Sequence, residues 1–181
     1  MKARQSLRPQ DILVVLKLVT LKGEPSRQID LALSLGLSQA EVGFSLARLR
    51  ILGFLSPLTN TPYMGALLDF LVYGLKHVFP TEIGRFVRGT PTSSSASPLS
   101  SKFRLPPEAV LVWPDPEGKV RGQSLEPLYP SIPEAAKKDE KLYELLALTD
   151  ALRAGGTREV ELAKVELTKR LGLITKSLKR A

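Results

Sequence analysis

The sequence predicts an α+β fold that is mostly α-helical. Apolar residues recur at helical spacing over residues 9–21, 38–52, 63–79 and 140–153, whereas only residues 109–123 have the pattern of paired strands. With 181 residues, the chain is long enough for one good core with an appendage or for two small domains. We expect three segments: a first domain over residues 1–80, a loop with a small β-ribbon over residues 81–135, and a helical pair over residues 136–181.

The first two helices are indicated by proline and glycine punctuation. Pro9 suits the first turn of a helix that Gly23 ends, and Ser26 is the expected cap of the second helix. Residues 1–8 form a basic arm, either a frayed end or a contact for phosphate. The predicted buried positions of the two helices are Ile12, Leu13, Leu16, Val19, Ile29, Leu31, Ala32 and Leu35.

A tight turn leads into the third helix, over residues 38–52. Gly36 stands where a positive φ is needed, and Ser38 with Glu41 three residues later forms the pattern of a capping box. Gly53 ends the helix, and residues 54–58 follow as a short strand. The expected buried stripe of this helix is Val42, Leu46, Leu49 and Leu52.

These residues carry a family resemblance. Residues 31–55, LALSLGLSQAEVGFSLARLRILGFL, resemble the helix-turn-helix of winged-helix regulators of the MarR-like kind. The resemblance covers residues 1–80 and implies a winged-helix-like domain that binds DNA. A simple helical hairpin without DNA-binding function is the alternative interpretation.

The apolar stretch over residues 63–79 predicts a long helix in place of the return strand of a wing. We therefore expect the wing to be short or absent, which puts minor-groove contacts in question. The stretch contains Asp69, Lys76 and His77 and is too short and too polar for a transmembrane span, so no membrane association is expected. A helix that is apolar on most sides should be buried on most sides, either at the centre of the domain or in a dimer interface.

Residues 90–101 are rich in serine and proline and predict a mobile loop, or alternatively an extended segment lying on a partner. Residues 109–113 and 119–123 are expected to pair as a two-stranded ribbon, with Trp113 as a core anchor. Two helices follow, over residues 140–153 and from a cap at Thr157 to residue 171. They should pack as an antiparallel pair, against the first domain or in a dimer interface, ahead of a basic tail.

Charge and composition bound the function. The chain has 26 Lys and Arg against 18 Asp and Glu, a net charge of +8, which favours an acidic partner such as nucleic acid. Residues 1–60 hold 8 basic and 4 acidic side chains, and residues 136–181 hold 11 and 7. Because the chain has no cysteine, disulfides and thiolate metal sites are excluded. With no signal-peptide pattern, we expect a cytoplasmic protein.

The sequence contains little that would support catalysis. Its one histidine, His77, lies beside a lysine on the apolar helix, and none of the common nucleotide-binding, hydrolase or metalloprotease motifs occurs. We therefore expect no enzyme activity, no metal and no cofactor.

The favoured prediction is a sequence-specific transcriptional regulator that binds double-stranded DNA as a homodimer and reads the major groove with helix 38–52. Gln39 is suited to an adenine edge, and Phe44 or Ala40 to a thymine methyl group. Gly43 lies on the same outward face, where it would allow close approach to the DNA. The expected phosphate contacts are Ser26, Arg27, Ser38, Arg48 and Arg50.

A protein-interaction module is the competing hypothesis. The outward face of helix 38–52 is poor in the Arg, Lys, Asn and Ser that DNA-reading helices usually present, and Phe44 there also suits a protein contact. In that case the domain would dock onto an operon-encoded protein partner, as an antitoxin-like protein or a complex subunit.

Overall fold

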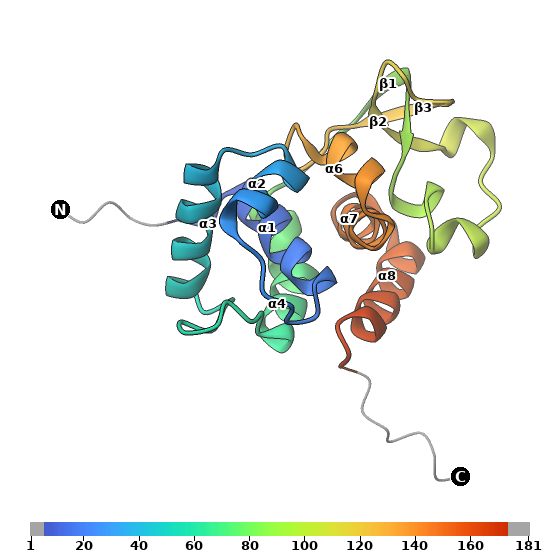
Figure 1. Ribbon diagram of the computed structural model, residues 1–181. Coiled ribbons are helices and arrows are strands. Elements are labelled where there is room, and N and C mark those ends of the chain that lie inside the picture. Colours follow the sequence, from blue (N-terminus) through green and yellow to red (C-terminus); the bar gives the residue numbers. More distant parts are fainter. Residues whose placement is uncertain (1–5, 174–181) are drawn as a thin grey trace, which may run out of the picture.

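The computed structural model describes residues 6–173 and has a mostly helical α+β fold, as predicted (Figure 1). Three helices come first, α1 (Pro9–Thr20), α2 (Gln28–Leu35) and α3 (Gln39–Ile51). An interrupted helix follows, made of α4 (Met64–Asp69), η1 (Phe70–Gly74) and α5 (Leu75–Val78). A small barrel of β1 (Ile83–Pro91), β2 (Leu111–Pro114) and β3 (Val120–Leu125) precedes α6 (Ile132–Lys138), α7 (Glu140–Ala154) and α8 (Thr157–Arg170).

Helix α1 lies inside the molecule because α3 and α7 pack against different sides of it. All five residues from Ile12 to Leu16 are fully buried. The sequence predicted burial of only one side, and Val14 and Val15 are therefore corrections to that prediction. One of the helices that pack on α1 is α7, which lies more than a hundred residues further along the chain.

The turn between α2 and α3 forms as predicted. Gly36 has φ +65°, and the Ser38 hydroxyl accepts from the Glu41 amide at 3.2 Å while the Ser38 amide donates to Glu41 at 2.8 Å. Ser26 does not cap α2, because Arg27 occupies the N-cap position and no side chain accepts there. Two predicted core positions are instead at the surface, Ile29 at 40% and Leu52 at 37% exposure.

No wing strand follows α3 in the described part of the chain. The only pairing between residues 52 and 63 is a single bridge between Leu55 and Pro62, so the strand expected over residues 54–58 is wrong. The Phe54 ring packs edge-to-face on Phe70 with centroids 5.4 Å apart, which ties this turn to the next helix.

The helix predicted over residues 63–79 runs from Met64 to Val78, with a π-helical turn, η1, in its middle. The Phe70 ring lies over Gly74, where a Cβ would come within 2.8 Å of it. Leu67, Leu71 and Leu75 are buried, whereas Tyr73 and Val78 are exposed at 64% and 49%. This helix covers the core of the chain with one face only, so a place at the centre of the domain was a wrong expectation. A dimer interface for its exposed face stays a prediction.

The sheet differs from the expected two-stranded ribbon. β1 pairs antiparallel with both β2 and β3, and β2 and β3 pair with each other in parallel, which closes a small barrel. The sequence analysis missed β1, IGRFVRGTP, because its glycines, arginines and proline do not alternate with apolar residues. Closure needs glycine on the inside: a Cβ on Gly89 would overlap the Trp113 carbonyl oxygen, and one on Gly122 would overlap that of Val110.

The serine-rich segment over residues 90–101 is folded, so the predicted mobile loop is wrong. It forms the end of β1 and two short 3₁₀ helices, Ser93–Ser95 and Leu99–Ser101, packed on α7 and α8. The Thr92 hydroxyl donates to Asp150 at 2.8 Å, and the Ser95 hydroxyl accepts from the Leu111 amide at 2.8 Å. These two hydroxyl groups thus have partners that compensate their burial, whereas the buried Ser93 hydroxyl has none among residues 6–173.

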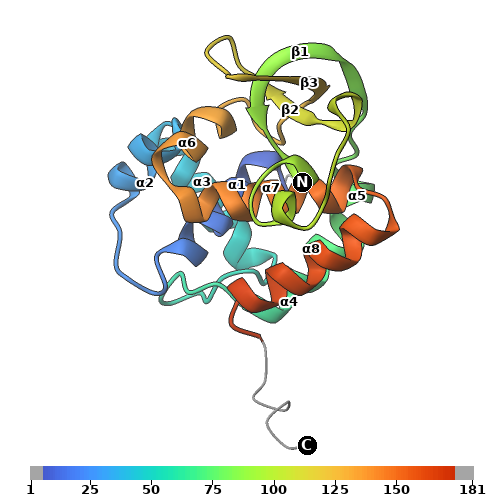
Figure 2. The ribbon, with the colours of Figure 1, turned by 90° about the vertical axis from the view of Figure 1, so that its right-hand side faces the viewer.

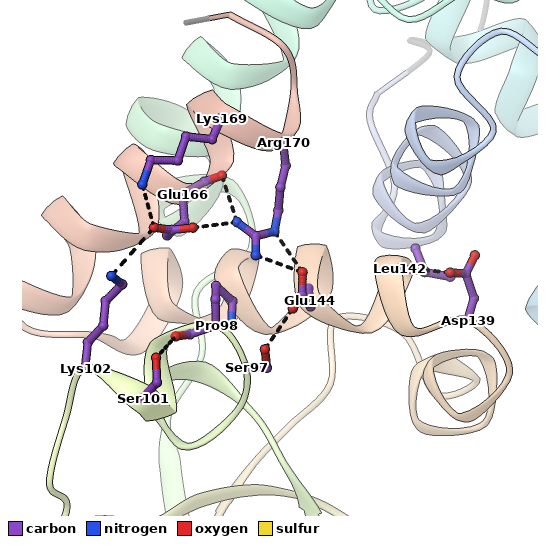
Figure 3. A network of polar contacts seen from close by, with 10 residues as sticks. All are labelled: Ser97, Pro98, Ser101, Lys102, Asp139, Leu142, Glu144, Glu166, Lys169 and Arg170. Atoms are coloured by element: carbon purple, nitrogen blue, oxygen red, sulfur yellow. Dashed lines mark hydrogen bonds and ion pairs between the residues drawn. The ribbon is translucent and has the colours of Figure 1, made fainter.

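The C-terminal helices pack back onto the rest of the molecule, one of the two arrangements expected. α7 contacts α1, α5, α6 and α8, and nine of its residues are buried. A polar cluster joins α7, α8 and the serine-rich segment (Figure 3): Arg170 donates to Glu144 at 2.8 Å, and Glu144 also accepts from the Ser97 hydroxyl at 2.7 Å. Gly156, and not Thr157, is the N-cap of α8.

A single hydrophobic core contains residues of all three predicted segments, including Leu16, Trp113 and Leu148. The expected boundary between residues 135 and 136 falls inside α6. The barrel lies over α7 (Figure 2), where the Trp113 indole donates to Asp150 at 2.6 Å and the Tyr143 hydroxyl donates to the Pro91 carbonyl at 2.6 Å. Trp113 is fully buried, as predicted.

Candidate nucleic-acid interface

Helix α3 lies at one edge of the molecule, on the side away from the barrel (Figure 1). Its first turn is exposed at Ser38, Gln39 and Ala40, while Val42 and Leu46 point into the core. The left-handed Gly36 and the Ser38–Glu41 capping box set this orientation, since both fix the direction in which the helix begins. The structure therefore presents the N-terminal half of α3 to solvent.

Arg48 faces the core and not the solvent. Its guanidinium forms two hydrogen bonds with the Asp11 carboxylate, at 2.9 and 2.6 Å, and a third with the Ser45 hydroxyl at 3.2 Å. Asp11 is fully buried and also accepts from the Arg8 amide at 2.8 Å, at the start of α1. The hydrogen bond with Asp11 raises the pKa of Arg48. This pairing joins α1 to α3 and leaves Arg48 little capacity for a phosphate.

The other two arginines of the predicted set remain at the surface. The Arg50 Nε donates to the Asn60 side chain at 2.8 Å, which joins the end of α3 to the turn over residues 56–62. Arg27 pairs with Asp30 at 2.8 Å, but its side chain is 80% exposed. An exposed ion pair of this kind contributes little to stability. A DNA phosphate can therefore compete with Asp30 for Arg27 at small cost in free energy.

Gly43 allows α2 and α3 to approach each other. A Cβ at this position would lie 3.3 Å from the Gln28 side-chain oxygen. The glycine thus has a packing role on the side of α3 that faces α2, in addition to any role in contacting a ligand. Ser26 lies nearby and lines a surface hollow of about 550 Å³ between the α1–α2 loop and residues 59–62.

The first turn of α3 also carries a negative charge. The Ser38 amide holds the pKa of Glu41 below its ordinary value, and the Tyr129 hydroxyl donates to the same carboxylate at 3.1 Å. Tyr129 comes from the loop before α6, a contact that no local sequence pattern indicated. A DNA phosphate at the extreme N-terminus of α3 would be repelled by this carboxylate. Contacts with the DNA backbone are therefore expected further along the helix.

Large apolar side chains occupy the remaining outward positions. Phe44 is 64% and Ile51 66% exposed, and their spacing of seven residues places them on one side of α3. Leu33 on α2 is 69% exposed. The sequence analysis identified Phe44 but not Ile51 or Leu33, although their helical phase, opposite to the buried stripe, was the available signal.

No family model, curated protein or solved structure matches this chain. The interpretation of the α2–α3 face therefore depends on its own residues. Within residues 6–173, none of the helices is both long and apolar enough to cross a membrane. What the α2–α3 face presents is a capped helix end with Gln39 and Ala40 exposed, two surface arginines at its margins, and an apolar strip led by Phe44.

Proposed function

We propose that the protein is a transcriptional regulator that binds double-stranded DNA by placing α3 in the major groove. The observation that carries this proposal is the exposed first half of α3, held by the Gly36 turn and the Ser38–Glu41 box at an edge of the molecule. Gln39 has the amide geometry that pairs with adenine, and Ala40 and Phe44 suit thymine methyl groups. The net charge of +8 supports association with DNA.

The proposed phosphate contacts are Arg27 and Arg50. Arg27 is exposed and Arg50 is half-buried, and each keeps donors beyond its intramolecular bond. Ser38 is left out because the Glu41 carboxylate lies at the same helix start and bonds to it. Arg48 is left out of this set because Asp11 engages it in a nearly buried pair.

The proposal includes a cytoplasmic homodimer. One helix in one groove reads few base pairs, and a two-fold partner doubles the contacts on a palindromic site. The exposed Tyr73 and Val78 on the helix over residues 64–78, with Val165 on α8, supply apolar surface for such a contact. Lys164 donates to the Tyr73 hydroxyl at 3.2 Å, which shows that these two elements adjoin.

The test is fluorescence anisotropy with duplex DNA from the protein's own promoter, compared with a scrambled duplex over a salt series. Preference for the promoter, lost on Gln39→Ala, supports sequence reading. The Arg27→Ala and Arg50→Ala variants should weaken binding on both duplexes by similar factors. Lys141→Ala, an exposed cation on α7, is the matched control. Equal affinity for both duplexes, unchanged by Gln39→Ala, would overturn the proposal.

A second candidate function is supported by the exposure of Phe44 and Ile51. An apolar strip flanked by polar residues is also the composition of a protein-docking site, and it would fit an operon-encoded partner of an antitoxin-like protein or complex subunit. Under this alternative, Phe44→Ala and Ile51→Ala abolish co-purification with the neighbouring gene product, whereas Gln39→Ala does not. The DNA titration then shows no sequence preference.

A further inference from the structure

The outer face of β1 and β3 places two arginines directly opposite each other. Arg88 and Arg121 are cross-strand partners in the antiparallel pair, so both side chains leave the sheet on the same side. Both are exposed. Side chains in this relationship start about 5 Å apart, and like charges in such a pair destabilise the sheet. An anion bound between them would remove that repulsion.

An aromatic ring and an amide lie beside the arginines. Phe86 precedes Arg88 by two residues and is paired with Gln123, which follows Arg121 by two, so all four side chains share one face. The Phe86 ring is 44% exposed. The interior of the barrel, by contrast, is occupied by Gly89, Gly122 and the backbones of the neighbouring strands.

Positive charge on this face is not neutralised within the protein. The sequences of β1 and β3, IGRFVRGTP and VRGQSL, contain no acidic residue, and Lys119, directly before β3, adds a further exposed cation. Among residues 6–173, none of the ion pairs involves these cations. The carboxylates of the turn between β2 and β3, Asp115 and Glu117, instead face Lys137, at 3.1 and 3.8 Å.

We propose that this face, formed by Phe86, Arg88, Arg121 and Gln123 with Lys119 at its margin, binds single-stranded nucleic acid. Paired guanidinium groups suit backbone phosphates, an exposed ring suits base stacking, and an amide suits a base edge. The exposed Phe86 ring offers the flat aromatic contact that an unpaired base requires.

This site is separate from the α2–α3 face. In Figure 1 the barrel and α3 lie at opposite sides of the molecule, with α1 and α7 between them. Loss of duplex binding by α3 variants would therefore leave the proposed single-strand binding unchanged, and the two proposals succeed or fail independently.

The test is anisotropy of labelled oligo(U) and oligo(dT) with the full chain over a salt series. Arg88→Gln with Arg121→Gln should weaken binding at least tenfold and reduce the salt slope by about 1.4, the value for two single-strand phosphate contacts. Phe86→Leu keeps an apolar side chain but removes the ring, and should weaken binding by about fivefold or more.

Lys76→Gln with Lys141→Gln removes the same charge from other exposed positions and is the matched control. Circular-dichroism melting of every variant checks that the barrel is folded. A higher affinity for oligo(U) than for oligo(dT) identifies RNA as the ligand. Equal affinities identify single-stranded RNA and DNA alike as ligands. The proposal would be overturned if the wild-type chain did not bind either oligonucleotide, or if the control pair lost as much affinity as the arginine pair. It would also be overturned if the chain bound duplex DNA or phosphatidylserine vesicles more tightly than single strands through the same four residues.

Discussion

Arg48 and Asp11 form a two-point ion pair that locks α3 onto α1, with hydrogen bonds of 2.9 and 2.6 Å. The Asp11 side chain is fully buried and that of Arg48 is 11% exposed. The carboxylate also accepts from the Arg8 amide at the start of α1, so one buried group both begins that helix and positions α3. The orientation of the candidate DNA-reading helix therefore depends on a contact between residues 37 positions apart.

Replacing Arg48 by alanine should destabilise the fold by about 3–5 kcal/mol, because it leaves a buried carboxylate without its partner. Urea denaturation followed by circular dichroism measures this change. Arg50→Ala, which removes a half-buried hydrogen bond to Asn60, should cost less than about 1.5 kcal/mol. A stable Arg48→Ala protein that has selectively lost DNA affinity would show instead that Arg48 contacts phosphate.

Gly36 should not tolerate a side chain. Its φ of +65° is costly for other residues, and a Cβ would come within 3.1 Å of the Ser131 Cβ. We expect Gly36→Ala to lower the free energy of unfolding by about 1–2 kcal/mol. Gly65→Ala is the matched control, since its Cβ would meet open space in a helix, and it should raise stability by up to about 1 kcal/mol. Equal melting temperatures for the two variants would contradict this account.

The parts that the sequence predicted correctly are those encoded by neighbouring residues. The Gly36 turn and the Ser38–Glu41 box need only a few consecutive side chains, and both form as expected. The Arg48–Asp11 pair was not predictable in this way, since the outward or inward direction of a flanking arginine depends on a partner in another helix. Arg48 was consequently assigned to phosphate, although the structure uses it between α1 and α3.

The barrel and the serine-rich segment were missed for a related reason. β1 has no apolar alternation, because its outer positions hold Phe86 and Arg88 while Gly89 takes an inner one. The segment over residues 90–101 has the composition of a mobile loop, yet the Thr92 hydroxyl finds an acceptor on α7 and the Ser95 hydroxyl a donor on β2. Composition indicates how much apolar surface a segment can bury. It does not reveal which hydrogen-bond partners the rest of the chain provides for its polar side chains.

Thr92 gives a direct test of that anchoring. Its hydroxyl donates to the buried Asp150 carboxylate, which also accepts from Trp113 and Arg153. Thr92→Val keeps the shape but removes one donor, and we expect a loss of about 1.5–3 kcal/mol, the range for hydrogen bonds to charged groups. Thr59→Val, at an exposed turn, should change stability by no more than about 0.5 kcal/mol. Hydrogen exchange that is unchanged over residues 92–99 in Thr92→Val would contradict the anchoring role.

Asp139 should make the stability of the protein depend on pH. Burial alone would raise the pKa of this carboxyl, but the hydrogen bond from Lys17 at 2.7 Å and that from the Leu142 amide outweigh it and hold the pKa below its ordinary value. A carboxylate whose pKa is lower in the folded than in the unfolded state stabilises the fold above the unfolded pKa of about 4, and this contribution is lost as pH falls through the folded value.

Asp139→Asn should therefore reduce the unfolding free energy at pH 7 and flatten its decline below about pH 4. Denaturation curves at several pH values measure both effects, and Asp69→Asn, at an exposed helix position, should change neither. An Asp139→Asn protein that loses stability with acid as steeply as the wild type would assign the acid sensitivity to other carboxylates.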